Sequence, residues 1–318
     1  MKKLLILGGL AFALSLVYGY LAKPSKPAKA QKAIEVTAPP ATAGKQGKLL
    51  SAFFGLDNAL PFGANLLCRG AADKDGMPVV LSNTIDGETL EPQDFKVITS
   101  AGIERTPSCV TLRPASDEGE LRTVLMIGEF GDAEFDPPAR VLVVDDLLSD
   151  GATGEQVNFR GAEISVIPLA DGPTLVWADI VPPALWSQTD GDSACPANTE
   201  QVVRVTWAGG VRLPNGDELG DAQRALYRVS VTHTDGSTEE VSPIKLSDLG
   251  DRDNNHLLCL KTSAPARTVT FPAGHLVDPN GDLNPDSGIS IDSLVGHPSG
   301  TSRKESYNAV ISENIANG

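Results

Sequence analysis

The sequence predicts an all-β protein made of two β-sandwich domains, and three observations support this fold class. Short segments rich in Val, Ile, Leu and Thr recur along the chain, each bounded by Gly, Pro, Asp or Asn. Beyond the N-terminal segment, no stretch of about 12 or more residues has a helical period of apolar positions. The length of 318 residues accommodates two domains of ordinary size. Closely spaced strands without intervening helices are typical of sandwiches and barrels.

Residues 1–30 predict an export signal or a membrane anchor. Two lysines precede an apolar run from Leu4 to Val17, which is the arrangement of a signal peptide. An Ala-x-Ala motif at 28–30 allows cleavage before Gln31. The alternative is a retained anchor, because the apolar run extended to Ala22 has 19 residues and a membrane helix needs about 20. Both interpretations predict an exported protein, in the periplasm, at the cell surface or secreted, that meets a membrane only through this segment if it stays uncleaved.

Residues 31–50 are predicted to be a linker, since Pro, Ala and Lys dominate there without apolar periodicity. The remainder of the protein is strongly acidic. From Leu49 onward it carries 18 basic and 40 acidic residues, a net charge of −22. Such a charge repels nucleic acid, which we exclude as a partner, and anionic membrane surfaces. It suits cations, basic partners or solubility in a salty medium.

The four cysteines are predicted to form two disulfide bonds. They match no zinc or haem spacing, and an even count in an exported protein favours pairing. Four cysteines allow three pairings. Nearest-neighbour pairing places one disulfide in each predicted domain, joining Cys68 to Cys109 and Cys195 to Cys259. Free thiols in a cytosolic protein are the alternative.

The first sandwich is predicted over residues 51–183. Its strands are expected at 77–82, 94–100, 109–114, 121–130, 139–146, 162–169 and 174–181. In the second of these, Phe95, Val97 and Thr99 alternate with Lys96 and Ile98, as in a strand with one buried face. Two prolines and an acidic loop at 181–196 interrupt the strand pattern, and we place the domain boundary there.

Residues 78–102 resemble the opening of bacterial Ig-like domains of secreted and cell-surface proteins. An apolar strand that ends in Ser leads through an acidic turn to a Leu-x-Pro-x-Asp-Phe step, which here runs from Leu90 to Phe95. The resemblance extends to about Gly128. It implies an Ig-like β-sandwich in a module that presents or spaces other domains, and it carries over no catalytic residue.

A second Ig-like sandwich is predicted over residues 184–292, followed by a polar tail at 293–318. Its strands are expected at 201–209, 225–233, 256–262 and 267–274. Cys195, Trp207 and Cys259 have the order and approximate spacing of the cysteines and core tryptophan of immunoglobulin domains, but position 257 is Leu instead of the corner tyrosine. Two interpretations remain: an immunoglobulin-type disulfide that joins the two sheets of the sandwich, or an unrelated sandwich with a peripheral disulfide.

Two acidic loops of the second domain are candidate calcium sites. DPNGDLNPD (278–286) and SDLGDRDNNH (247–256) place oxygen-bearing side chains at alternate positions, and calcium takes six to eight oxygen ligands. If the strand starting at His256 pairs with the strand ending at Gly274, both loops project from one end of a sheet. The candidate ligands are Asp278, Asn280, Asp282, Asn284, Asp286, Asp251, Asp253 and Asn255.

The alternative is that these residues only form turns. Residues 278–281, Asp-Pro-Asn-Gly, suit a type I turn. The match to a helix-loop-helix calcium loop fails, because Leu283 and Ile289 stand where Gly and Glu are required. Calcium at these loops and plain turn formation therefore remain alternatives.

No catalytic residue can be assigned. The four histidines have no metal-hydrolase spacing, and no nucleophile elbow, P-loop or dinucleotide fingerprint occurs. The sequence favours a non-catalytic binding, adhesion or structural role toward an unknown protein or glycan ligand, with calcium as a candidate stabiliser. The alternatives are a secreted hydrolase acting on a polymer and a membrane-anchored component of an envelope assembly. Trp177 and Trp207 are expected in the core, and Trp186 at the domain interface or in a ligand surface.

Overall fold

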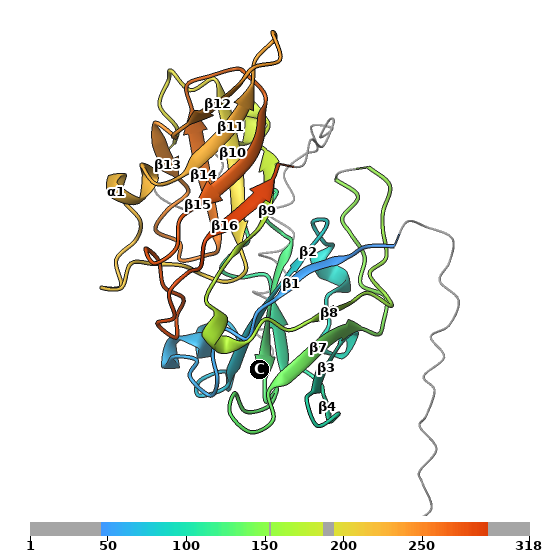
Figure 1. Ribbon diagram of the computed structural model, residues 1–318. Helices are drawn as coiled ribbons and strands as arrows, with labels where there is room; N and C mark the ends of the chain where they lie inside the picture. The colour runs from blue at the N-terminus through green and yellow to red at the C-terminus, as the bar shows by residue number, and fades with distance from the viewer. Residues whose placement is uncertain (1–45, 153, 187–193, 292–318) are drawn as a thin grey trace, which may run out of the picture. The chain divides into compact units, whose positions relative to one another are not determined.

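The computed structural model describes residues 46–152, 154–186 and 194–291, all within one compact unit. The predicted signal or anchor, the linker up to residue 45 and the polar tail lie outside the described residues. The described part is all-β, with sixteen strands in four antiparallel four-stranded sheets (Figure 1). Its helical elements are one short α-helix, α1 (Asp221–Arg224), and five 3-10 helices. Among these residues no helix is long and apolar enough to cross a membrane.

The first sandwich contains the strand orders β1-β2-β6-β5 and β4-β3-β7-β8. Its strands are β1 (Leu49–Ala52), β2 (Asp75–Leu81), β3 (Phe95–Thr99), β4 (Glu104–Arg105), β5 (Cys109–Thr111), β6 (Thr123–Gly128), β7 (Pro138–Val143) and β8 (Glu163–Ser165). Its 3-10 helices are η1 (Phe62–Leu66), η2 (Gly87–Thr89) and η3 (Pro92–Asp94). A single apolar core is built from the inner faces of both sheets.

The second sandwich contains the orders β13-β14-β10-β9 and β12-β11-β15-β16 around its own core. Its strands are β9 (Leu175–Ile180), β10 (Gln201–Trp207), β11 (Arg228–Thr232), β12 (Thr238–Val241), β13 (Lys245–Ser247), β14 (Asn255–Leu260), β15 (Ala266–Phe271) and β16 (Ser287–Ser290). The 3-10 helices η4 (Leu169–Asp171) and η5 (Pro183–Leu185) flank β9. Counted from the first strand of each sandwich, the two strand orders are identical.

The Leu-x-Pro-x-Asp-Phe step places a core residue at the start of β3. The backbone N–H of Glu91 donates to Asp94 Oδ2 at 2.7 Å, which closes the η3 turn. Phe95 then enters the core, fully buried, and Val97 pairs opposite Val141 of β7. The alternation predicted for β3 is present, because its first, third and fifth residues are buried and the two between them are half-buried. Each such large apolar side chain contributes about 1.5–3 kcal/mol by burial.

The boundary between the sandwiches lies earlier than the sequence suggested. Strand β9 pairs with β10, with Ile180 opposite Val203, so it belongs to the second sandwich. The last strand of the first sandwich, β8, ends at Ser165, and the boundary falls between β8 and β9 instead of at residue 183. The two prolines after β9 misled the prediction because they begin a connection between two strands of one sheet.

The strands at 256–262 and 267–274 do not pair, so the condition under which both acidic loops would project from one end of a sheet is not met. Strand β14 lies between β13 and β10, whereas β15 lies between β11 and β16 in the opposite sheet. The chain crosses from one sheet to the other between them. The acidic loops that precede β14 and follow β15 therefore do not flank one hairpin.

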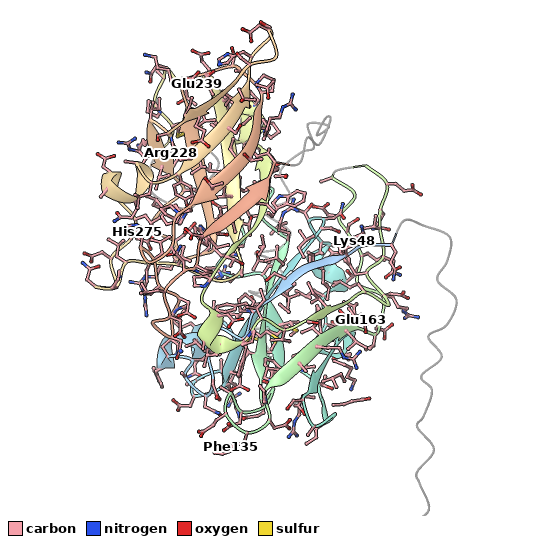
Figure 2. All side chains as sticks on the ribbon, in the orientation of Figure 1. Lys48, Phe135, Glu163, Arg228, Glu239 and His275 are labelled. Carbon is pink, nitrogen blue, oxygen red and sulfur yellow. A yellow bond between two sulfur atoms is a disulfide. The ribbon has the colours of Figure 1, made fainter. Side chains whose placement is uncertain are left out.

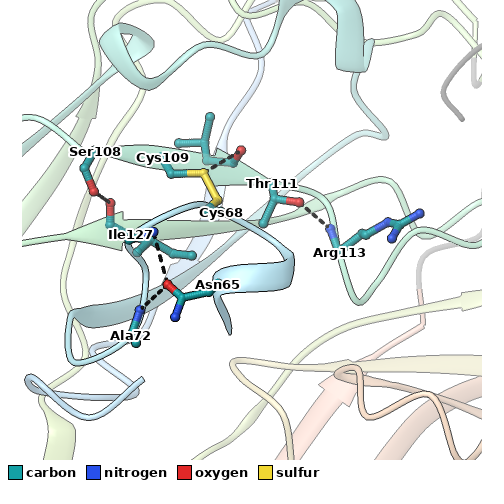
Figure 3. The surroundings of a disulfide bond; sticks show 10 residues. Asn65, Cys68, Ala72, Ser108, Cys109, Thr111, Arg113 and Ile127 are labelled. Carbon is teal, nitrogen blue, oxygen red and sulfur yellow. Dashed lines mark hydrogen bonds between the residues drawn. A yellow bond between two sulfur atoms is a disulfide. The ribbon is translucent and has the colours of Figure 1, made fainter. Parts of the chain in front are cut away.

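Both predicted disulfides are present. Cys68 follows η1 and bonds to Cys109 at the start of β5, beside a small apolar cluster that includes Ile127 (Figure 3). Asn65 orders the same loop, because its Oδ1 accepts the backbone N–H groups of Gly70 and Ala72.

The second disulfide does not join two sheets. Cys195 precedes β10, and its partner Cys259 lies on β14, the neighbour of β10. Trp207 is also on β10 and is fully buried. An immunoglobulin-type disulfide connects strands of opposite sheets, so that interpretation is excluded. The alternative, a peripheral disulfide, is confirmed. Trp186 packs with Cys195 in a small cluster on this sheet, and its Nε1 donates to the Val181 carbonyl at 2.8 Å.

Candidate metal centre

In the DPNGDLNPD loop, Asp278 organises a turn. Its side chain is buried, and Oδ1 accepts the backbone N–H groups of Gly281 and Asp282 at 2.8 and 2.9 Å. The Gly281 N–H also donates to the Asp278 carbonyl, which is the bond of a β-turn. Asn280 Nδ2 donates to Asp282 Oδ2 at 2.6 Å.

The other side chains of this loop bind backbone as well. Asn284 Oδ1 accepts the N–H groups of His275 and Leu276 at 3.0 and 2.8 Å, and Asp286 Oδ1 accepts the N–H of Ala273 at 2.9 Å. His275 is exposed and lies edge-on to the ring of Phe271 (Figure 2). These contacts fix the connection from β15 to β16. Calcium binding by this loop stays a prediction.

The second predicted loop connects β13 to β14. Asp253 is buried; its Oδ1 accepts the backbone N–H of Asn255 at 2.7 Å and its Oδ2 accepts Asn255 Nδ2 at 2.9 Å. Asn255 Oδ1 accepts the Thr206 hydroxyl of β10 at 2.7 Å. Asp251 is half-buried, and its Oδ1 accepts the N–H of Asp253 at 3.3 Å.

A cluster of carboxylates from both sandwiches includes one of the predicted residues. Asp117, Asp248 and Asp251 each offer an oxygen, and these oxygens lie within 4.8 Å of one another. In residues 46–152, 154–186 and 194–291, this is the one such group of three His, Cys, Asp or Glu side chains. Asp117 lies in the β5–β6 connection of the first sandwich, and the other two lie in the β13–β14 loop. Asp117 and Asp248 are buried.

Sequence reasoning selected Asp251 as a candidate ligand, included Asp248 only as a member of the same acidic loop, and missed Asp117. Asp117 is in the other sandwich, so no local spacing connects it to the β13–β14 loop. A local signal exists only for Asp248, which belongs to the same acidic loop as Asp251. Its backbone φ of 66° is in the left-handed region, where non-glycine residues are uncommon.

Arg204 supplies a buried positive charge beside this cluster. Its Nε and Nη2 donate to Oδ1 and Oδ2 of Asp179 at 3.0 and 2.8 Å, and its Nη1 lies 3.9 Å from Glu120 Oε1. Each of the three side chains is at most 2% exposed. Gly119 permits this approach: its φ is 87°, and a Cβ there would lie 2.7 Å from Arg204 Nη1.

The electrostatics around Glu120 are dominated by burial and like charges. Burial raises the pKa of Glu120 well above its ordinary value; Asp253 and Asp248 raise it further, and Arg204 lowers it. Burial also raises the pKa of Asp253 to about 8, and Asp251 adds to that shift. Burial and the neighbouring carboxylates therefore favour the protonated, neutral forms of Glu120 and Asp253.

Further polar contacts connect the two sandwiches next to the cluster. The guanidinium of Arg122 lies over the ring of Trp177, 4.4 Å from its centroid, and Arg122 Nη1 donates to the Ser82 carbonyl. Asn254 Nδ2 donates to the Thr123 hydroxyl at 3.2 Å and to the Trp207 carbonyl at 2.6 Å. We call this set of contacts, with the Arg204 pairs and the carboxylate cluster, the junction.

A chain of buried hydrogen bonds runs through the second core. Trp207 Nε1 donates to the Tyr227 hydroxyl at 3.2 Å, and that hydroxyl lies 3.0 Å from His256 Nδ1. Burial lowers the pKa of His256 to about 4. The neutral imidazole accepts a hydrogen bond from the Tyr227 hydroxyl. This series of hydrogen bonds from Trp207 through Tyr227 to His256 is therefore complete only while His256 is neutral.

The Trp207–Tyr227–His256 hydrogen bonds predict that the free energy of unfolding decreases on acidification. The His256 pKa is about 4 in the folded protein and about 6.5 in the unfolded chain, so the unfolded chain binds more protons between these values. The stabilisation is complete above pH 6.5 and disappears as the pH falls to 4, a loss of about 3 kcal/mol. Urea unfolding at pH 7 and pH 4 should show this loss in the wild type and lack it in His256→Asn.

The His256→Asn variant is a necessary comparison because titration of Asp253 changes the free energy of unfolding with pH in the opposite direction. Its raised pKa means that the folded protein binds the extra proton, which favours folding at lower pH. The difference between wild type and variant removes this contribution. An equal pH dependence in both proteins would contradict the role of His256.

Two surface cavities are lined by residues outside the junction. One includes Arg228 of β11 and Asp286, and the other includes Lys48 and Glu163 (Figure 2). Neither is lined by Glu120 or Asp253, the carboxyl groups whose pKa values burial raises most clearly at the junction.

Comparison with known proteins gives no family. No family model and no curated protein matches the sequence. Among solved structures, the chain is similar to the N-terminal part of the bacterial S-layer protein SbsC, with 10% identity and a TM-score of 0.25. The match covers 78% of this chain and 45% of that structure, so the chain spans less than half of its length. Similarity at this level carries no argument about function.

Proposed function

We propose that this protein is an exported, non-catalytic structural or binding module built from two Ig-like sandwiches. Both strand orders correspond to the A-B-E-D and C′-C-F-G sheets of immunoglobulin-like domains, which supports the Ig-like assignment. Two disulfides with no free cysteine in the chain support export, because such bonds form and persist in oxidising compartments.

The buried junction is the observation that carries the structural role. Arg204 is held within the second sandwich by two hydrogen bonds to Asp179, a geometry with little freedom, and its guanidinium lies 3.9 Å from Glu120 of the first sandwich. Asn254 of the second sandwich also donates to the Thr123 hydroxyl of the first. Tandem sandwiches joined in this way form a stiff unit whose end loops are available to a protein or glycan ligand. No contact in the described residues specifically favours the polymer hydrolase.

Export is tested by the location and redox state of the full chain produced in a bacterium. Fractionation followed by non-reducing peptide mapping should find the protein outside the cytosol with both disulfides formed. A matched variant, Leu10→Arg with Leu14→Arg, disrupts the N-terminal apolar run and should remain in the cytosol with free thiols. Wild-type protein found in the cytosol with four free thiols would overturn the proposal.

A further inference from the structure

We propose that the folded protein cleaves its own chain between Asp278 and Pro279, with the Asp278 side chain as the attacking group. The carboxyl group of Asp278 attacks the main-chain carbonyl carbon of the same residue, and Pro279 leaves as an amine. This activity goes beyond the proposed export and structural role and does not depend on it. It rests on how the fold holds the turn that contains this bond.

The carboxyl group of Asp278 lies beside the main-chain carbonyl group that it would attack. The backbone N–H of Gly281 donates to Asp278 Oδ1 at 2.8 Å and also to the Asp278 carbonyl oxygen at 3.1 Å. Two oxygens that share one N–H donor are held near each other, so the side chain is fixed next to its own carbonyl group. An unfolded chain must first find this arrangement, whereas the folded turn already has it.

The shared N–H group also favours the attack electrostatically. When a carboxyl oxygen adds to the carbonyl carbon of Asp278, negative charge develops on the carbonyl oxygen. The Gly281 N–H already donates to that oxygen and stabilises the developing charge. The leaving nitrogen belongs to proline and carries no hydrogen, so it needs a single proton to depart as a secondary amine.

The second carboxyl oxygen of Asp278 is placed to supply that proton. The side chain is fully buried, and Oδ1 accepts the backbone N–H groups of Gly281 and Asp282. Oδ2 has no hydrogen-bond donor among the described residues. Burial raises the pKa of Asp278, although the backbone hydrogen bonds from Asp282 and Gly281 lower it in part. The neutral carboxyl group therefore carries its proton on Oδ2, the oxygen that receives no N–H.

The reaction is a hydrolysis in two steps. First, Oδ1 forms a bond to the main-chain carbonyl carbon of Asp278, and the bond from that carbon to the Pro279 nitrogen breaks. The electron pair of the broken bond stays on the nitrogen, which takes the proton from Oδ2. The product is a cyclic anhydride of Asp278. Water then opens the anhydride, which leaves Asp278 with a free main-chain carboxyl group. Pro279 is exposed, so water has access to this side of the turn.

Arg212, outside the turn, holds the chain on both sides of the bond. Its backbone pairs with Val277 through hydrogen bonds of 3.0 and 2.8 Å, and its Nη2 donates to the Pro279 carbonyl at 3.2 Å. Strand β16, which follows the turn, is paired with β15. The two fragments are therefore expected to stay associated in the native state. They should separate on unfolding, since no cysteine follows residue 278.

The other Asp–Pro bond of the chain, between Asp136 and Pro137, lacks this arrangement. Asp136 Oδ1 accepts the Ser100 hydroxyl at 3.0 Å and the Ala101 N–H at 2.8 Å, so its carboxylate is bound to a different turn. The hydrogen bond from Ala101 lowers the pKa of Asp136, which disfavours the neutral carboxyl group that the reaction requires. This bond is an internal control in the same molecule.

Mass spectrometry of the purified full chain under denaturing conditions measures the cleavage. The protein is incubated folded at about pH 5.5 and about pH 8, and separately unfolded in urea at the same pH values. We expect fragments that end at Asp278 and begin at Pro279, formed at least about 10-fold faster in the folded protein than in urea. The rate should be higher at the lower pH, where more of the Asp278 carboxyl group is neutral. It should not depend on protein concentration, because the reaction is intramolecular.

Three variants assign the reaction to the turn. Asp278→Asn keeps a side-chain oxygen for the Gly281 N–H but lacks the carboxyl group, and it should slow the cleavage at least about 10-fold. Pro279→Ala keeps the carboxyl group but changes the leaving nitrogen, and it should also slow the cleavage at least about 10-fold. Pro279 is exposed, so this second variant tests the reaction even if Asp278→Asn fails to fold. The matched control Asp136→Asn should be cleaved at 278–279 like wild type.

Three results would overturn the proposal. Absence of a fragment that begins at Pro279 in the wild type would exclude the reaction. Equal cleavage at the two Asp–Pro bonds, or equal rates in folded and unfolded protein, would show the ordinary lability of such bonds instead of an effect of the fold. Cleavage at the full rate in both Asp278→Asn and Pro279→Ala would assign it to a contaminating protease.

Discussion

Replacing Arg204 with methionine is expected to lower the free energy of unfolding by about 3 to 5 kcal/mol, because removing one partner of a buried ion pair leaves an uncompensated charge. The two hydrogen bonds to Asp179 are lost, and Glu120 loses the positive charge that lies 3.9 Å from its Oε1. Methionine is flexible and fills much of the same space, so a cavity contributes little to the expected loss. Chemical denaturation at pH 7 in the presence of a chelator measures the effect.

Two further variants make this test specific. Arg140→Met breaks an exposed pair with Glu163, where both side chains are at least 50% exposed, and should cost less than about 1 kcal/mol. Adding Asp179→Leu to Arg204→Met removes the stranded carboxylate and should recover part of the loss, since apolar replacements of buried pairs are often nearly neutral. A cost below about 1 kcal/mol for Arg204→Met alone would show that the junction does not depend on this pair.

The sequence predicted the central strands of the sheets better than the edge strands. All eleven expected strands are present, whereas β1, β4, β12, β13 and β16 were not expected. Every strand in that second group lies at the edge of its sheet. Strand β12, Thr-Glu-Glu-Val, shows the reason: its residues are exposed or half-buried and carry charge, as edge strands often do to avoid pairing with other chains. Such segments lack the apolar pattern on which strand prediction depends.

The candidate site was predictable only where its signal was local. Asp251 and Asp253 stand out in one acidic loop, and the turn at 278–286 can be read from adjacent residues. The approach of Asp117 and Glu120 to that loop depends on how two sandwiches pack. Gly119 illustrates the difficulty, because its close contact with Arg204 on β10 joins segments from different domains. No spacing within either domain encodes that contact.

Removing the disulfide between Cys195 and Cys259 is expected to lower the free energy of unfolding by about 4 kcal/mol. The bond joins residues separated by 64 positions, and closing a loop of that length restricts the unfolded chain by about this amount. The double variant Cys195→Ala with Cys259→Ala avoids a free thiol. Its Tm should fall by roughly 8 to 16 °C, which is a large effect for a protein of ordinary marginal stability.

The bond between Cys68 and Cys109 provides the matched comparison. Its separation is 41 positions, so the same chain-entropy argument predicts a slightly smaller loss for the corresponding double Ala variant. Cys259 is fully buried on β14, and Cys195 packs in the small cluster that contains Trp186, so replacing both residues also removes packing. Both effects make the second disulfide the more costly one to lose. Equal stability of the oxidised wild type and the Cys195/Cys259 variant would mean that strand pairing between β10 and β14 alone restrains this part of the chain.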